Sequence, residues 1–222
     1  MAKKISEDDY RYDPEPRWPA AVAVLAIGGL YAALPQSLIV GPRWMFISII
    51  TILLIPTIIS HRAAYHELNR VLGFIVTGTI TFAVILSVIF LIYDLPEFKE
   101  FPARLLTSAA ILWATNILAF SLWYWRLDAG GPHIRETRFG HTDGAFLFPQ
   151  MTLDPEAKRA ANEEAWSPNF FDYLFLAFNT STAFSPTDVP VLARWAKILM
   201  MIQSVISLTV LALLAARAVN IL

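Results

Sequence analysis

The sequence predicts an all-α, polytopic membrane helix bundle with about five transmembrane helices and one shorter, re-entrant, pore-like half-helix. Apolar residues make up 56% of the 222 residues and charged residues only 16%, whereas soluble globular chains contain about 25% charged residues. The mean hydropathy is +0.53. Five uncharged stretches are long enough, or nearly so, to cross a bilayer, whose ~30 Å hydrocarbon core needs about 20 helical residues.

Composition also excludes several function classes. The chain contains no cysteine, which excludes disulfides, thiol nucleophiles and thiolate metal sites. The formal net charge of −1 gives no reason to expect a nucleic-acid partner. The partner that the composition does predict is the lipid bilayer, in an integral, multi-pass protein of the cell membrane.

Four spans are expected in the N-terminal half, after a polar tail over residues 1–17. Uncharged runs cover residues 18–42, 44–60, 71–93 and 105–125, and the first run ends as a helix near Pro35. Aromatic residues at the ends of the runs, such as Trp18, Trp44 and Tyr93, match an interfacial belt. Residues 18–125 are therefore predicted to form four transmembrane helices.

Residues 126–166 are expected to form an extramembrane loop. Gly130, Gly131 and Pro132 end the fourth helix and turn the chain. A hairpin is expected about residues 140–144, and a short surface helix over residues 154–166, which Asp154 and Pro155 would begin. Because Phe139, Phe146 and Phe148 are too many aromatic residues for a free loop, we expect this segment to pack on the membrane face or beneath the short helix.

Residues 167–222 are predicted to form a re-entrant half-helix, a polar turn and a final transmembrane helix. Residues 173–187 carry no charge, but they are too few for a span and become polar in their second half. Ser167 and Pro168 would start a short helix that ends near Thr180. Asp188 would then cap a last helix that runs from about residue 190 to residue 220.

This order of short helix, Thr/Ser-rich turn and long helix resembles the pore module of tetrameric potassium channels. The stretch 171–178, followed by Thr182-Ala183-Phe184-Ser185-Pro186-Thr187-Asp188, also resembles an uncharacterised family of predicted bacterial inner-membrane proteins. These resemblances imply a membrane protein with an ion-channel-like terminal module. The glycines of the potassium filter are absent, and Pro186 lacks an N–H, so these residues cannot build a potassium filter of the usual form.

The candidate site is a pore-like turn rich in hydroxyl groups, together with polar positions on the last helix. The turn comprises Asn179, Thr180, Ser181, Thr182, Ser185, Thr187 and Asp188, and the last helix contributes Gln203, Ser204 and Ser207. A carboxylate at a pore mouth concentrates cations. The predicted function is a channel-like pore module that forms a homo-oligomer and conducts an inorganic ion.

Two other functions remain open from the same residues. The hydroxyl groups and Gln203 also suit hydrogen bonds between packed helices, in an accessory membrane protein that does not transport and that docks a partner through residues 126–166. A membrane enzyme would have to use His133, His141, Asp128 and Asp143. Since neither zinc-ligand spacing nor a nucleophile motif is present, we expect no enzyme activity, metal or cofactor.

The orientation stays open at this point. With five spans, the side that holds the N-terminal tail and the 126–166 loop collects most of the basic residues, and Arg194 and Lys197 are assigned to the other side. The positive-inside rule then places the N-terminus in the cytoplasm, whereas a potassium-channel pore loop would face outward. If residues 169–187 cross fully, there are six spans and both termini lie inside.

Overall fold

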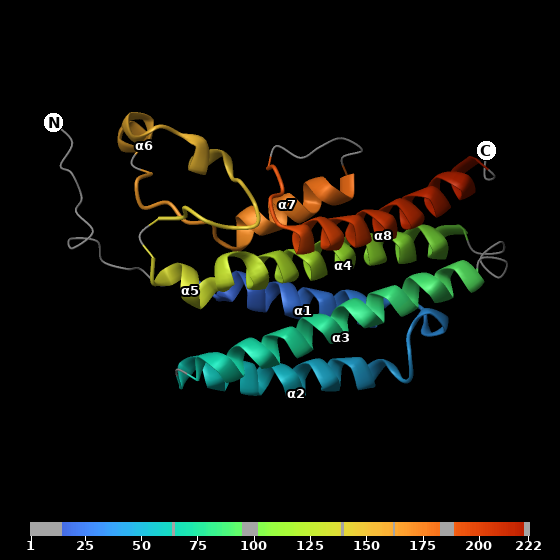
Figure 1. Cartoon of the computed structure of the whole chain (residues 1–222). Coiled ribbons are helices and arrows are strands. Elements are labelled where there is room, and N and C mark those ends of the chain that lie inside the picture. Colours follow the sequence, from blue (N-terminus) through green and yellow to red (C-terminus); the bar gives the residue numbers. More distant parts are fainter. Residues whose placement is uncertain are drawn as a thin grey trace.

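The computed structural model describes residues 15–63, 65–94, 102–138, 140–161, 163–182 and 189–219. Every regular element in this part is helical, which confirms the predicted all-α bundle (Figure 1). The α-helices are α1 (Trp18–Ala33), α2 (Arg43–Arg62), α3 (His66–Tyr93), α4 (Pro102–Leu127), α5 (Pro132–Glu136), α6 (Pro155–Ala161), α7 (Phe170–Thr182) and α8 (Arg194–Val219). Short 3₁₀ turns lie at η2 (Gln36–Leu38), η4 (Asp128–Gly130) and η5 (Pro149–Thr152).

Four of the helices, α2, α3, α4 and α8, are long and apolar enough to cross a membrane. The protein is therefore a helical membrane protein. Five spans were predicted, and the remaining one, α1, is apolar but has only 16 residues, a length of about 24 Å. The helix ends at Ala33 because the extended backbone of Leu34 leads into Pro35, which cannot continue a helix.

The long helices run alternately in opposite directions around α4 (Figure 1). Helix α4 packs against α1, α3, α7 and α8, and this central position explains why it is the most buried of the four long helices. We call the end of the bundle where α4 finishes the loop end, and the end where η2 lies the turn end. Helix α1 begins at the loop end and α8 finishes at the turn end, so the two outermost described helix termini lie at opposite ends.

The 126–166 loop folds back onto the loop end of the bundle. Ala129 adopts a positive φ of 50° and Gly131 one of 94°, and these two residues reverse the chain after α4. Farther along, Phe146 forms an isolated antiparallel bridge with Val191. The hairpin expected about residues 140–144 is therefore wrong in its partner: residues 145–147, which directly follow it, pair with the segment before α8, through Leu147 N–H to Pro190 O (2.9 Å) and Leu192 N–H to Ala145 O (2.8 Å).

Aromatic side chains fix the loop in place. Phe146 and Phe148 are buried, as expected of a packed segment, while Phe139 lies outside the described residues. The Phe146 ring contacts Tyr173 of α7 and Trp195 of α8 edge-on, with ring centroids 6.2 and 6.0 Å apart. The loop thus joins the first turns of α7 and α8 at the loop end.

Three helix boundaries differ from the sequence expectations. Helix α6 is capped by Asp154 as predicted, with its Oδ1 accepting from the N–H groups of residues 156 and 157, but the helix is shorter than predicted. Helix α7 begins at Phe170 rather than 168, because Asn169 and Asp172 cap it reciprocally. Helix α8 begins at Arg194 rather than near 190, because the backbone of residues 190–192 pairs with the loop. The expected Asp188 cap lies outside the described residues.

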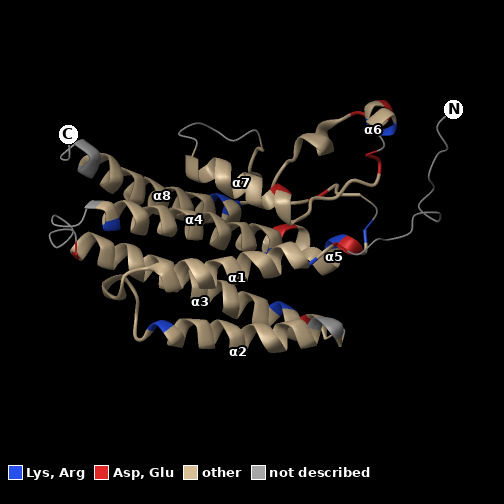
Figure 2. Ribbon diagram, turned by 180° about the vertical axis from the view of Figure 1, so that it is seen from behind, with Lys and Arg blue, Asp and Glu red and all other residues tan. Residues whose placement is uncertain are grey.

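The structure also corrects the assignment of two basic residues. Arg194 and Lys197 lie in the first turns of α8, next to the bridge with the loop, so they belong to the loop end and not to the opposite side. In Figure 2 most of the described basic residues gather at the loop end, and Arg43 and Arg104 lie at the turn end. The asymmetry of basic charge is therefore greater than the sequence count indicated.

The aromatic packing yields a stability prediction. Phe146→Ala should lower the free energy of unfolding by about 3–5 kcal/mol, because it removes a fully buried ring that touches two helices. Phe175→Ala is the matched control, since the Phe175 ring is 57% exposed on the outer face of α7 and should change little. Thermal unfolding in detergent measures both. Rapid proteolytic cleavage of the parent protein between residues 140 and 151 would contradict the packed loop.

Candidate functional site

Helix α7 is a half-helix that enters the bundle from the loop end. Its 13 residues span about 20 Å, which is short of the ~30 Å hydrocarbon core. Tyr173, in its first turn, contacts the end of α4. The chain leaves α7 at Thr182, and Val191 is back at the loop end, bridged to Phe146. Helices α7 and α8 therefore start at the same end, which is the topology of a re-entrant segment.

A network of hydrogen bonds around Gln203 holds α7 between α4 and α8. The Gln203 Nε2 group donates to the Ala177 carbonyl and to Ser181 Oγ, both at 2.7 Å. Its Oε1 accepts from the Tyr124 hydroxyl at 2.5 Å. Gln203 is fully buried, so one amide side chain from α8 ties together a helix on each side.

The other end of this network lies between α4 and α8. Asn116 Nδ2 donates to Ser207 Oγ at 2.9 Å and to the Gln203 carbonyl at 3.2 Å. Asn116 and Ser207 are both buried. Polar pairs of this kind stabilise contacts between membrane helices, by about 0.6 kcal/mol each on average. The structure thus brings Ser181, Gln203 and Ser207 together inside the helix packing.

The remaining predicted site residues lie nearer the surface or outside the described residues. Thr180 is buried and its hydroxyl donates to the Leu176 carbonyl at 2.8 Å. Asn179 and Thr182 are half-buried at the inner end of α7, and the Thr182 hydroxyl donates to the Phe178 carbonyl at 2.9 Å. Ser204 is half-buried with Oγ 3.5 Å from the Thr180 carbonyl. Ser185, Thr187 and Asp188 lie outside the described residues.

A second buried cluster, centred on Asp128, joins α4, the loop and α7. The Asp128 side chain is fully buried; Oδ2 accepts from the Tyr173 hydroxyl at 2.6 Å and Oδ1 from the Ala145 N–H at 2.5 Å. Since a phenol is a much weaker acid than a carboxylic acid, the Tyr173 hydroxyl donates the proton in this bond. His141 Nε2 lies 3.5 Å from Oδ2.

Arg135 links this cluster to Glu15, which lies just before α1. Its Nη1 donates to the carbonyls of Trp125 and Asp128, both at 2.9 Å, and its Nη2 pairs with Glu15 at 3.0 Å. The guanidinium also lies 5.0 Å from the centre of the Tyr173 ring. The sequence analysis named Asp128 only as one of the four residues that a membrane enzyme would have to use. The signal that could have identified it as structural is a carboxylate at the very end of an apolar helix, followed by a Gly-Gly-Pro turn.

The four residues of the enzyme alternative do not form one site. His141 lies beside Asp128, but Asp143 pairs with Arg138 at 2.8 Å on the surface, and His133 stacks on His66 with the ring centroids 3.6 Å apart. Within the described residues, no group of three or more His, Asp or Glu side chains is placed to hold a metal ion.

The Gln203 network yields a second prediction. Gln203→Leu should lower the free energy of unfolding by about 1–3 kcal/mol, because it leaves the buried Tyr124 hydroxyl without an acceptor and removes the side-chain bonds to Ala177 and Ser181. Ser204→Ala, one residue along α8, removes only a long contact and should shift stability by less than about 0.5 kcal/mol. Unfolding in mixed detergent measures both, and equal effects of the two variants would show that the network does not hold α7.

The re-entrant topology yields a third prediction. Since the natural chain has no cysteine, single variants Asp143→Cys, Leu192→Cys and Val40→Cys can be labelled with a membrane-impermeant maleimide in sealed vesicles of one orientation. The first two should react from the same side and Val40→Cys from the other, because residues 143 and 192 lie at the loop end and residue 40 at the turn end. Labelling of residues 143 and 192 from opposite sides would mean that residues 170–188 cross the membrane.

Comparison with known proteins identifies no relative. No protein-family model matches the sequence, and neither the search of curated proteins nor that of solved structures finds a match. A function for this membrane protein must therefore be argued from the helices and their polar contacts alone.

Proposed function

We propose that this protein is a homo-oligomeric, channel-like pore module of the cell membrane that conducts a small inorganic cation along the inner end of α7. The observation that carries the proposal is the re-entrant course of the chain between Phe170 and Val191. Backbone that is not helical at membrane depth is tolerated only where protein or water surrounds it. A half-helix followed by a full span that starts from the same end of the bundle is the arrangement that pore loops use.

The direction of α7 favours a cation. A helix carries the equivalent of about half a negative charge at its C-terminal end, and the α7 C-terminus at Thr182 is directed into the bundle from the loop end. Asn179 and Thr182 add side-chain oxygens there that are not fully buried. Half-helices in transporters present their C-terminal carbonyls to cations in the same way.

We assign the path to the contact between copies, because the polar residues inside a single chain are taken up by helix packing. Gln203 fills the contact between α7 and α8, and Ser181 and Ser207 are buried with it. We therefore assign these three residues to holding α7, and the conducting surface to the 179–188 segment. The outer faces of α7 and α8 carry exposed apolar side chains, including Phe171, Phe175, Phe178, Met201, Val205 and Leu208, which suit lipid or a second copy.

The basic residues support one orientation. Cytoplasmic ends of membrane proteins are enriched in Lys and Arg, and the loop end holds most of the described basic residues (Figure 2). We therefore place the loop end in the cytoplasm, so that α7 enters the membrane from the cytoplasmic side. This orientation is opposite to that of the pore helix of a potassium channel. Residues 179–188 also lack the glycines of a potassium filter.

The second candidate function is that of an accessory protein that docks a partner through residues 126–166. The observation that favours it is the rigid attachment of this loop by the Asp128 cluster and by the Phe146 aromatic contacts. A folded surface of this kind can serve as a docking platform without any conduction, and the buried state of Ser181 and Gln203 is compatible with it.

Ion flux into liposomes that hold the purified protein distinguishes the two functions. We expect cation flux above the protein-free background, and a lower flux in Thr182→Val, because the side-chain oxygen at the inner end of α7 is lost. Asp188→Asn should also lower cation flux and weaken its salt dependence. Thr51→Val in α2 is the matched control, since its hydroxyl makes the same bond to a carbonyl one turn earlier.

The outcomes are distinct. Absence of flux under any gradient or voltage would reject the pore and leave the accessory function. Flux that is unchanged in both Thr182→Val and Asp188→Asn would place the path elsewhere in the protein.

A further inference from the structure

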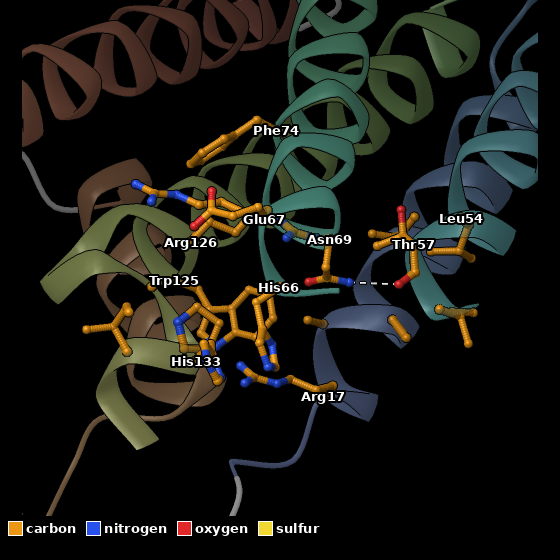
Figure 3. Close-up of a pocket in the computed structure, with 18 of the residues that line it drawn as sticks. Arg17, Leu54, Thr57, His66, Glu67, Asn69, Phe74, Trp125, Arg126 and His133 are labelled. Carbon is orange, nitrogen blue, oxygen red and sulfur yellow. Dashed lines mark hydrogen bonds between the residues drawn. The ribbon is translucent and has the colours of Figure 1, made fainter. Parts of the chain in front are cut away.

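A cavity of about 380 Å³ opens at the loop end, between α1, α2, α3 and the end of α4 (Figure 3). Its volume lies in the range of about 300–1,000 Å³ that is usual for small-molecule sites. The inner wall is apolar and includes Val24, Leu54, Ile58 and Phe74. The outer wall is lined by basic residues: Arg17, His66, Arg70, Arg126 and His133. Among the described residues that line the cavity, Glu67 alone is acidic.

Arg126 is a buried cation at this cavity. Its Nε atom is buried without a hydrogen-bond partner, and no carboxylate among the described residues pairs with it. The guanidinium lies 5.3 Å from the centre of the Trp125 ring and presses against Gly73 of α3. A Cβ atom at residue 73 would collide with the guanidinium, so the glycine provides the space that Arg126 occupies.

Arg17 brings a second buried cation to the same cavity. Its Nη2 pairs with Glu136 at 2.7 Å, but its Nη1 is buried without a hydrogen-bond partner in the described chain. Burial lowers the pKa of Arg17, and the carboxylates of Glu136 and Glu15 oppose this effect. Both guanidinium groups lie over the Trp125 ring, 5.5 and 5.3 Å from its centre, so two like charges lie close together and repel each other. An anion between the two guanidinium groups would satisfy their free N–H groups and offset this repulsion.

The charges at the cavity sum to a small positive excess. Glu136 neutralises Arg17, and Glu67 offsets one of the two remaining arginines, Arg70 and Arg126. An uncompensated charge of about +1 therefore remains when the histidines are neutral. His66 and His133 stack in parallel at the mouth (Figure 3), where they can donate N–H groups to the same anion. This balance suits a monoanion such as a phosphodiester.

The apolar wall identifies the rest of the ligand. Val24 of α1 and Leu54 of α2 lie farther into the bundle than the arginines, toward the hydrocarbon core. A free phosphate has no apolar part that these side chains could contact. Basic pockets between membrane helices bind the headgroups of anionic lipids. We propose that the cavity binds an anionic phospholipid of the surrounding bilayer, with its phosphate between Arg17 and Arg126 and an acyl chain along α1 and α2.

Binding to the full-length protein in a non-ionic detergent tests the proposal. The probes are phosphatidylglycerol, phosphatidylcholine with the same acyl chains, and inorganic phosphate, and the readouts are native mass spectrometry and thermal stabilisation. We expect phosphatidylglycerol to bind about tenfold or more tightly than phosphatidylcholine, because only the former supplies net negative charge. Inorganic phosphate should give no stabilisation. Equal binding of the two lipids, or equal stabilisation by inorganic phosphate, would overturn the proposal.

Variants locate the site. Arg126→Gln should weaken phosphatidylglycerol binding about tenfold by removing a charged hydrogen bond, and Gly73→Ala should weaken it while keeping every charge. Ala21→Leu, which narrows the apolar part of the cavity, should weaken lipid binding with the arginines intact. Arg138→Gln is the control, since Arg138 is a basic residue of the same end that pairs with Asp143 outside the cavity. Equal effects of Arg126→Gln and Arg138→Gln would indicate general surface attraction and reject the cavity.

Discussion

The buried carboxylate of Asp128 is the interaction on which the arrangement of the C-terminal half depends. A carboxylate without partners is costly to bury, so its two oxygens must find donors, and they find them on two different segments: the Tyr173 hydroxyl of α7 and the Ala145 N–H of the loop. Asp128 directly follows α4, the most buried of the long helices. Its hydrogen bonds therefore attach both the loop and α7 to the central helix of the bundle. Loss of either donor would leave one carboxylate oxygen without its hydrogen bond, so the three segments stabilise one another.

This constraint explains how a helix as short as α7 can keep its place in a membrane protein. Helix α7 cannot anchor itself by length, since its ends do not reach both interfaces. It is held instead at two depths, by Tyr173 to Asp128 at its entrance and by Gln203 to Ala177 and Ser181 farther in. Between these anchors the apolar side chains of α7 pack on α4 and α8. The polar residues are therefore a requirement of the re-entrant course and not by themselves evidence of conduction.

The sequence predicts those features of this fold that depend on composition and local signals. The membrane helices follow from uncharged runs, and the Asp154 cap of α6 from a Ser/Thr/Asp-type start before proline. Signals that depend on distant partners were missed: the segment at residues 190–192 is extended because it pairs with residues 145–147, and no local pattern marks such a pairing. The cavity around Arg126 was missed for the same reason, since its walls come from five helices and Gly73 makes room for a side chain that lies more than fifty residues away.

Two charged residues at the C-terminal end of α4, Arg126 and Asp128, show how one end of a helix can serve both structure and binding. Asp128 and Arg126 are separated by one residue and therefore point to different sides of the chain, toward α7 and toward the cavity between α1 and α3. The carboxylate of Asp128 has a donor from the protein for each oxygen, whereas the buried Nε of Arg126 has no acceptor in the described chain. A buried charge that the protein fully satisfies serves the fold. In the proposed lipid site, the buried Arg126 takes its acceptor from outside the protein, and lipid phosphate is an anion that the headgroup region of a bilayer supplies.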